Sequence, residues 1–146
     1  DAAAPSGSAT STETATTTLS TQDKSVFRAI LGQLAKLPDA EHFVYPVDRD
    51  SYPEYYEAIK HPMDLSTVKE KLNGNRYTGV NDVLADLRQI WQNCRLFNVE
   101  GSEILEMAET CADTLEDMVE EKLGKEFRLP KSKLKKLKAE VASVAA

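Results

Sequence analysis

A proline-rich and aromatic segment interrupts a chain whose other patterns are helical. Residues 38–64 contain four of the six prolines and five of the ten aromatic residues. Proline removes a backbone donor and biases the preceding residue away from helical geometry, so this segment is not one long helix. A flexible linker would not contain so much aromatic surface. Because long irregular loops in compact domains usually build sites, we predict that residues 38–64 fold back and line a pocket.

Apolar residues recur at helical spacing on both sides of this segment and predict four amphipathic helices. No strand alternation is visible. The economical architecture is therefore an all-α, antiparallel four-helix bundle with one long connection and two short ones. The helices are expected at about residues 20–37, 64–73, 78–97 and 102–123.

Capping residues set the expected helix ends. Ser20 or Thr21 can cap the first helix, Asp64 the second and Ser102 the fourth. The second helix should end at Asn73-Gly74, because glycine adopts the left-handed conformation at little cost.

Charge and composition divide the 146 residues into three parts. Residues 1–19 are rich in Ser, Thr and Ala and are expected to form a disordered linker. Residues 20–123 form the folded domain, and residues 124–146 a basic extension that is separate and partly helical, or irregular. Residues 1–123 have a net charge of −11 and residues 124–146 of +5. An acidic body argues against a grip on nucleic-acid phosphates and favours a cationic partner.

The inventory of reactive groups is poor. Cys94 and Cys111 fall on apolar helix faces and are interpreted as reduced core thiols rather than a disulfide or a nucleophile. Two histidines offer little for a metal site. Without a nucleophile–base pair or phosphate loop, we predict no enzyme activity, no catalytic residue, no metal and no cofactor. No apolar run approaches a membrane span, and we expect a module of a larger protein.

Three motifs occur in chain order and together resemble the bromodomain family. They are PVD at 46–48, YPEYYEAIKHPMDLSTV at 52–68, and the Asn that ends WQNCRLFN at 98. The resemblance covers residues 22–123. It implies a left-handed bundle of helices Z, A, B and C, whose ZA and BC loops enclose a pocket for acetylated lysine.

The resemblance also implies roles for individual residues. Asn98 would donate its amide N–H to the acetyl carbonyl, and the Tyr55 hydroxyl would reach that carbonyl through an ordered water. Pro62, Met63 and Asp64 would close the loop onto the bundle. The pocket walls would be Phe43, Val47, Tyr52 and Phe97, with Ile104 as gatekeeper and Glu41 and His42 at the rim.

Such a pocket can read acetylation by rejecting charge. Burying an unpaired ammonium in an apolar pocket costs several kcal/mol, roughly, whereas an acetamide needs only its hydrogen bonds. Asn suits the recognition because its amide donates and remains neutral.

Several residues have a structural alternative. Asn98 alone could be a helix cap, Asn93 is expected to tie loop backbone to the bundle, and the methionines to fill the core. Tyr55 is favoured for the pocket over Tyr56. Asp48 and Asp64 are interpreted as caps or loop anchors rather than a catalytic pair.

Two positions depart from the family pattern. Glu41 and His42 stand where many bromodomains have the Trp and Pro of Trp-Pro-Phe, and the carboxylate in place of the Trp predicts a more acidic pocket mouth with less apolar contact.

We therefore expect a monomeric reader of acetylated histone tails in the nucleus, without a membrane. The first alternative is a degenerate bundle that serves as a protein–protein scaffold without acetyl-lysine specificity. The second, weaker alternative is nucleic-acid contact through the five lysines of KSKLKKLK in the basic tail.

Overall fold

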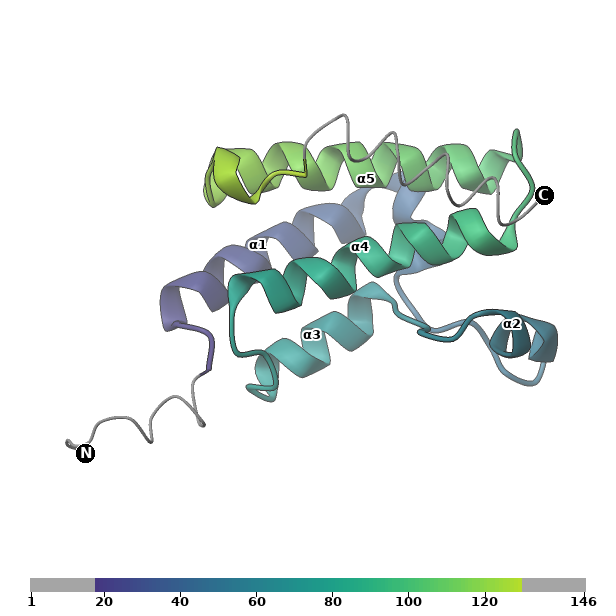
Figure 1. The fold of residues 1–146 in the computed structure, drawn as a ribbon, viewed down its shortest axis with the longest axis horizontal. Coiled ribbons are helices and arrows are strands. Elements are labelled where there is room, and N and C mark those ends of the chain that lie inside the picture. The colour runs from purple at the N-terminus through teal and green to yellow at the C-terminus, as the bar shows by residue number, and fades with distance from the viewer. Residues whose placement is uncertain (1–17, 130–146) are drawn as a thin grey trace.

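Four helices of the computed structural model form a left-handed bundle (Figure 1). They are α1 (Thr21–Lys36), α3 (Leu65–Asn73), α4 (Val80–Phe97) and α5 (Glu103–Lys122). The structure describes residues 18–129, and within that range it contains no strand. The predicted bundle is therefore confirmed. Most of the expected linker and the part of the basic extension from residue 130 onwards lie outside the described residues.

The expected caps are present with one exception. The Ser20 hydroxyl accepts from the N–H of Asp23 at 3.1 Å, and the Asp64 carboxylate accepts from the N–H of Thr67 at 2.9 Å. Ser102 stands at the N-cap of α5, but its side chain makes no capping hydrogen bond there.

The end of α3 differs from the prediction. Gly74 has a φ of −88°, so it is not left-handed. The left-handed residue is Asn75, with a φ of 58°. Asparagine tolerates this region because its short polar side chain can bond locally, so the reversal falls one residue later than expected.

The apolar faces of the helices meet in one core. The two cysteines are buried and free, which confirms them as core thiols. The fully buried side chains include Phe27, Ile30, Leu34, Val68, Leu72, Leu84, Leu87, Trp91 and Leu115.

The long connection between α1 and α3 contains short helices that periodicity could not reveal. They are η2 (Pro38–Phe43) and α2 (Pro53–Ala58), and each begins with a proline. Proline suits the first helical position because its fixed φ is helical and its missing N–H would have no partner. Figure 1 shows α2 set apart from the bundle, at the end where α4 passes into α5.

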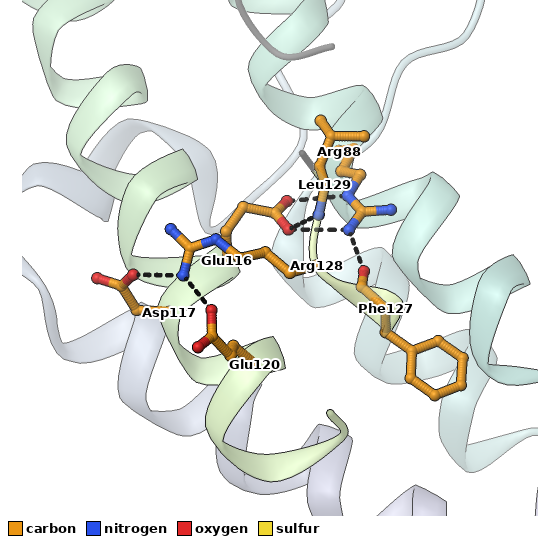
Figure 2. A network of polar contacts seen from close by, with 7 residues as sticks. All are labelled: Arg88, Glu116, Asp117, Glu120, Phe127, Arg128 and Leu129. Carbon is orange, nitrogen blue, oxygen red and sulfur yellow. Dashed lines mark hydrogen bonds and ion pairs between the residues drawn. The ribbon is translucent and has the colours of Figure 1, made fainter. Parts of the chain in front are cut away.

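The fold extends beyond both expected domain limits. Leu19, placed in the linker by composition, is buried, and its N–H donates to the Tyr77 carbonyl at 3.1 Å. After α5, residues 124–129 turn back onto the bundle through η3 (Lys125–Phe127), and Phe127 packs against the core. Figure 2 shows the polar contacts that hold this segment.

Candidate functional site

A cavity of about 410 Å³ opens at the end of the bundle where the α1–α3 connection meets the end of α4 and the start of α5. This volume is within the range of small-molecule sites. Its lining is mostly aliphatic and aromatic. It consists of His42, Phe43, Tyr45, Pro46, Val47, Asp48, Tyr52, Tyr55, Met63, Ile90, Cys94, Phe97, Asn98 and Ile104.

The residues predicted for the pocket come together here. The seven predicted binding residues line the cavity: Asn98, Tyr55, Phe43, Val47, Tyr52, Phe97 and Ile104. His42, predicted at the rim, also lines it. Glu41, predicted beside it, is exposed in η2 but is not part of the lining.

Asn98 is held by the last turn of α4. Its backbone N–H donates to the Cys94 carbonyl at 3.0 Å, and its side-chain Nδ2 donates to the same oxygen at 3.1 Å. The acceptor identifies which side-chain atom is the nitrogen. The same nitrogen also lies 3.5 Å from Cys94 Sγ, a weak acceptor. An amide nitrogen has two hydrogens, so one N–H can fix the orientation while a ligand competes only with the sulfur for the other.

Tyr55 forms an aromatic wall on α2. Its ring packs edge-on against Phe97, with centroids 4.9 Å apart, and against Tyr56 at 5.4 Å. Burial, with a smaller contribution from Tyr56, raises the pKa of Tyr55 to about 12. The side chain is therefore a neutral phenol that can donate a hydrogen bond at any physiological pH.

Neighbouring polar groups support the loop. Tyr56, which is outside the cavity lining, donates its hydroxyl to the Val47 carbonyl. Asn93 Nδ2 donates to the His61 carbonyl at 2.8 Å, which confirms its predicted role as a loop tie. Asp48 accepts from the Ser51 hydroxyl at 2.6 Å and is a loop anchor as expected.

Six lining residues were not named individually for the pocket, although four of them lie in residues 38–64, the segment predicted to line it. Ile90 belongs to the core period of α4, and Met63 was expected to fill the core, yet both also line the cavity. Cys94 precedes Asn98 by one helical turn, a spacing that could have placed it on the same face. The other three, Tyr45, Pro46 and Asp48, lie in the loop, where no period applies.

The thiol in the cavity lining is poorly suited to nucleophilic chemistry. Burial raises the pKa of the Cys94 thiol to about 11, so it is a weak nucleophile at neutral pH. Within residues 18–129, no group of three His, Cys, Asp or Glu side chains is placed to hold a metal ion.

No helix in that range has the length and apolar character needed to cross a membrane.

Comparison with known proteins assigns the class of module. The bromodomain family model matches residues 27–110, which is more than half of the chain. The chain belongs to the bromodomain family, whose members are generally acetyl-lysine readers in chromatin proteins.

Three relatives place this similarity among larger proteins. The chain is 34% identical over 110 residues to the nucleosome-remodeling factor subunit NURF301 of Drosophila melanogaster, covering 75% of the chain and 4% of the relative. It is 38% identical to the mouse tyrosine-protein kinase BAZ1B, over 55% of the chain and 5% of the relative. It is 39% identical to the histone acetyltransferase GCN5 of Yarrowia lipolytica, over 51% of the chain and 16% of the relative. The chain thus spans a small part of each.

Proposed function

We propose that this chain reads acetylated lysine, with Asn98 donating to the acetyl carbonyl. The observation behind this proposal is the anchored amide of Asn98 at the wall of an otherwise largely apolar cavity. A carbonyl oxygen is a stronger acceptor for the second N–H of Asn98 than the Cys94 sulfur, which lies 3.5 Å from the amide nitrogen. An acetamide supplies that oxygen, and its methyl group suits aliphatic and aromatic walls.

Discrimination would come from desolvation. An unmodified lysine would have to bury an ammonium among Phe43, Val47 and Ile104. The carboxylate in the lining, Asp48, is exposed and already accepts hydrogen bonds from Ser51 and Asp50, so it would act on charges at the mouth. Burying an unpaired ammonium costs roughly several kcal/mol, and the neutral acetylated side chain avoids that cost.

Tyr55 would support the same carbonyl through a bridging water. Its hydroxyl remains protonated because burial raises its pKa to about 12. Water-bridged hydrogen bonds are nearly as favourable as direct ones when both partners are fixed, and the packing of Tyr55 on Phe97 fixes the ring.

The proposed ligands are acetylated histone tails, and the proposed compartment is the nucleus. Two of the similar proteins are named as a nucleosome-remodeling factor subunit and a histone acetyltransferase, which supports a chromatin setting. The net charge of −11 on residues 1–123 suits a lysine-rich partner. We further propose that the module binds as a monomer, does no chemistry itself and uses no cofactor, and that it comprises at least residues 19–129.

Calorimetric titration with matched acetylated and unmodified lysine peptides tests the proposal. Asn98→Ala should weaken binding of the acetylated peptide by about 1–3 kcal/mol, up to about a hundredfold. Asn73→Ala is the matched control, because Asn73 is also at a helix end but contacts Arg28, outside the cavity lining. Equal affinity of wild type and Asn98→Ala would reject the role of Asn98. Equal affinity for both peptides would favour the scaffold alternative.

A further inference from the structure

The outer face of α5 presents a line of carboxylates. Eight of its 20 residues are Asp or Glu, and Lys122 is its only cation. Five of the acidic side chains recur at spacings of three, seven, four and three residues and so share one face of the helix. We call Glu103, Glu106, Asp113, Asp117 and Glu120 the α5 acidic stripe; the first four are exposed and Glu120 is half-buried.

The C-terminal end of this stripe is already occupied by the chain that follows α5. Arg128 Nη1 bonds Asp117 and Glu120, each at 2.9 Å. The Leu129 N–H donates to Glu116 at 2.9 Å, and Arg88 holds the Phe127 carbonyl at 2.8 Å. Figure 2 shows both arginines beside the α5 carboxylates. The segment is therefore fixed on α5 by backbone as well as side-chain contacts.

The order of these contacts gives the chain a direction. Gly124 has a φ of +120°, and the chain reverses there after α5 ends. Arg128 then bonds Glu120 and Asp117, and the next residue bonds Glu116. The backbone is thus returning along α5 toward its N-terminus when the described part ends at Leu129.

The rest of the stripe lies ahead in that direction and has no cationic partner among the described residues. Within residues 18–129, no Lys, Arg or His forms an ion pair with Glu103, Glu106 or Asp113. The next residues of the chain supply one, because KSKLKKLK at 131–138 contains five lysines and no acid. Glu116 and Glu106 are about 15 Å apart along a helix, and nine extended residues span up to about 30 Å. The segment can therefore reach the stripe.

We propose that the lysines of residues 131–138 dock on the α5 acidic stripe of the same chain, over Asp113 and Glu106. The stripe begins at Glu103, next to the cavity residue Ile104. If the proposed function holds, the docked segment competes with lysines that flank an acetyl-lysine for the same carboxylates. The docking itself rests on the contacts of Arg128 and Leu129 and does not depend on acetyl-lysine binding.

Nuclear magnetic resonance on the full chain tests the docking without any ligand. One variant replaces the five lysines by glutamine, and another combines Glu106→Gln with Asp113→Asn. We expect both to shift the amide signals of the α5 stripe and of the tail toward a common, undocked spectrum. Glu57→Gln with Glu70→Gln is the charge-matched control, because both residues are exposed outside the stripe and should leave the tail signals unchanged. Unchanged α5 signals in the five-glutamine variant would overturn the proposal.

Carbodiimide crosslinking identifies the occupant. In a mixture of ¹⁴N- and ¹⁵N-labelled protein, we expect bonds between tail lysines and Asp113 or Glu106 within one isotope form. Raising the salt from about 0.05 M to about 0.5 M shortens the Debye length roughly threefold and should lower the crosslinking yield, because exposed charge pairs are then screened. Mixed-isotope crosslinks alone would assign the stripe to a second copy and overturn the intramolecular proposal. Tail lysines that bind nucleic acid but do not crosslink to α5 would also overturn it.

Discussion

The side-chain amide of Asn93 donates to the backbone carbonyl of His61, 2.8 Å away, and so ties the long loop to α4. Its own oxygen accepts from Gln89 at 2.8 Å. Asn93 is 2% exposed, so both bonds are shielded from water. A buried amide that is satisfied on both sides positions one wall of the cavity relative to Asn98, five residues later on the same helix.

Asn93→Ala should therefore loosen the loop and destabilise the fold. It leaves the His61 carbonyl without its amide donor, and a lost buried partner costs about 1–3 kcal/mol. We expect faster hydrogen exchange in residues 53–63 and weaker acetyl-peptide binding. Gln92→Ala is the control on the same helix, because the Gln92 side chain is half-buried but makes no hydrogen bond within residues 18–129. An equal loss of stability in both variants, measured by denaturant unfolding, would contradict the loop-tie role.

Ile104→Ala should affect binding more than stability. Ile104 is half-buried at the start of α5 and lines the cavity, whereas Leu115 is fully buried on the same helix. A core truncation such as Leu115→Ala costs about 2–5 kcal/mol, and Ile104→Ala should cost less. Thermal unfolding and peptide titration of both variants make the comparison. A full core cost with unchanged binding would make Ile104 a packing residue only.

Glu116→Ala should be the most destabilising change of a charged residue. Glu116 is 3% exposed and binds Arg88 through two hydrogen bonds of 2.9 Å. Because Arg88 is partly exposed, we expect a loss of about 2–3 kcal/mol, toward the low end for a buried pair. Arg128→Ala removes the neighbouring exposed ion pairs and should lower the unfolding free energy much less. Equal losses of unfolding free energy in the two variants, measured by chemical denaturation, would contradict the prediction that the buried pair contributes more than the exposed pairs.

Alkylation should report on cavity occupancy through Cys94. Both Cys94 and Cys111 are buried thiols whose pKa values burial raises to about 11, so native labelling at pH 7.5 should be slow. Cys94 lines the cavity and Cys111 does not. An acetylated peptide should therefore slow the labelling of Cys94 and leave Cys111 unaffected. Equal protection of both thiols in mass spectrometry would indicate global stabilisation instead.

The raised pKa values of Cys94, Cys111 and Tyr55 predict how stability depends on pH. In the folded protein the pKa is about 11 for each thiol and about 12 for Tyr55, above the values in the unfolded chain. Their contribution to the free energy of unfolding is complete below the ordinary pKa values of a thiol and a phenol, about 9–10. It is lost as the pH rises toward the folded-state pKa values of about 11 and 12. Unfolding free energies measured from pH 8 to 11 should therefore fall, and a rise over that range would contradict the assignment.

The pocket mouth should combine weak aromatic contact with charge. Tyr45 lines the cavity and is 72% exposed, so it offers apolar contact to a ligand at the mouth. Glu41 is exposed on η2, at the position where the family resemblance implies tryptophan. Tyr45→Ala should weaken binding by about threefold and Glu41→Trp should strengthen it by a similar factor.

Lysines beside the acetyl-lysine should improve affinity by up to about fivefold at low salt, and by less at high salt. Peptide titrations at two salt concentrations decide this, and no effect of either substitution would reject it.

Local sequence patterns determined the four helices and most of the core. Residues such as Leu84, Leu87, Trp91 and Cys94 recur with the helical period, and that period is set by neighbours a few positions apart. Ser20 and Asp64 cap helices for the same local reason. Through the family resemblance, the motifs around Tyr55 and Asn98 also identified eight of the 14 residues that line the cavity.

Tertiary structure decided what depends on residues distant in the chain. The cavity includes Ile90, which the helical period assigns to the core, and the loop residue Met63, because the loop folds over the end of α4. Leu19 is buried because Tyr77 accepts its N–H. Residues 124–129 look like a solvated tail by composition, yet they fold back because Arg88 and Glu116 bind their backbone. Such contacts join residues 13 to 58 positions apart, and no local pattern encodes them.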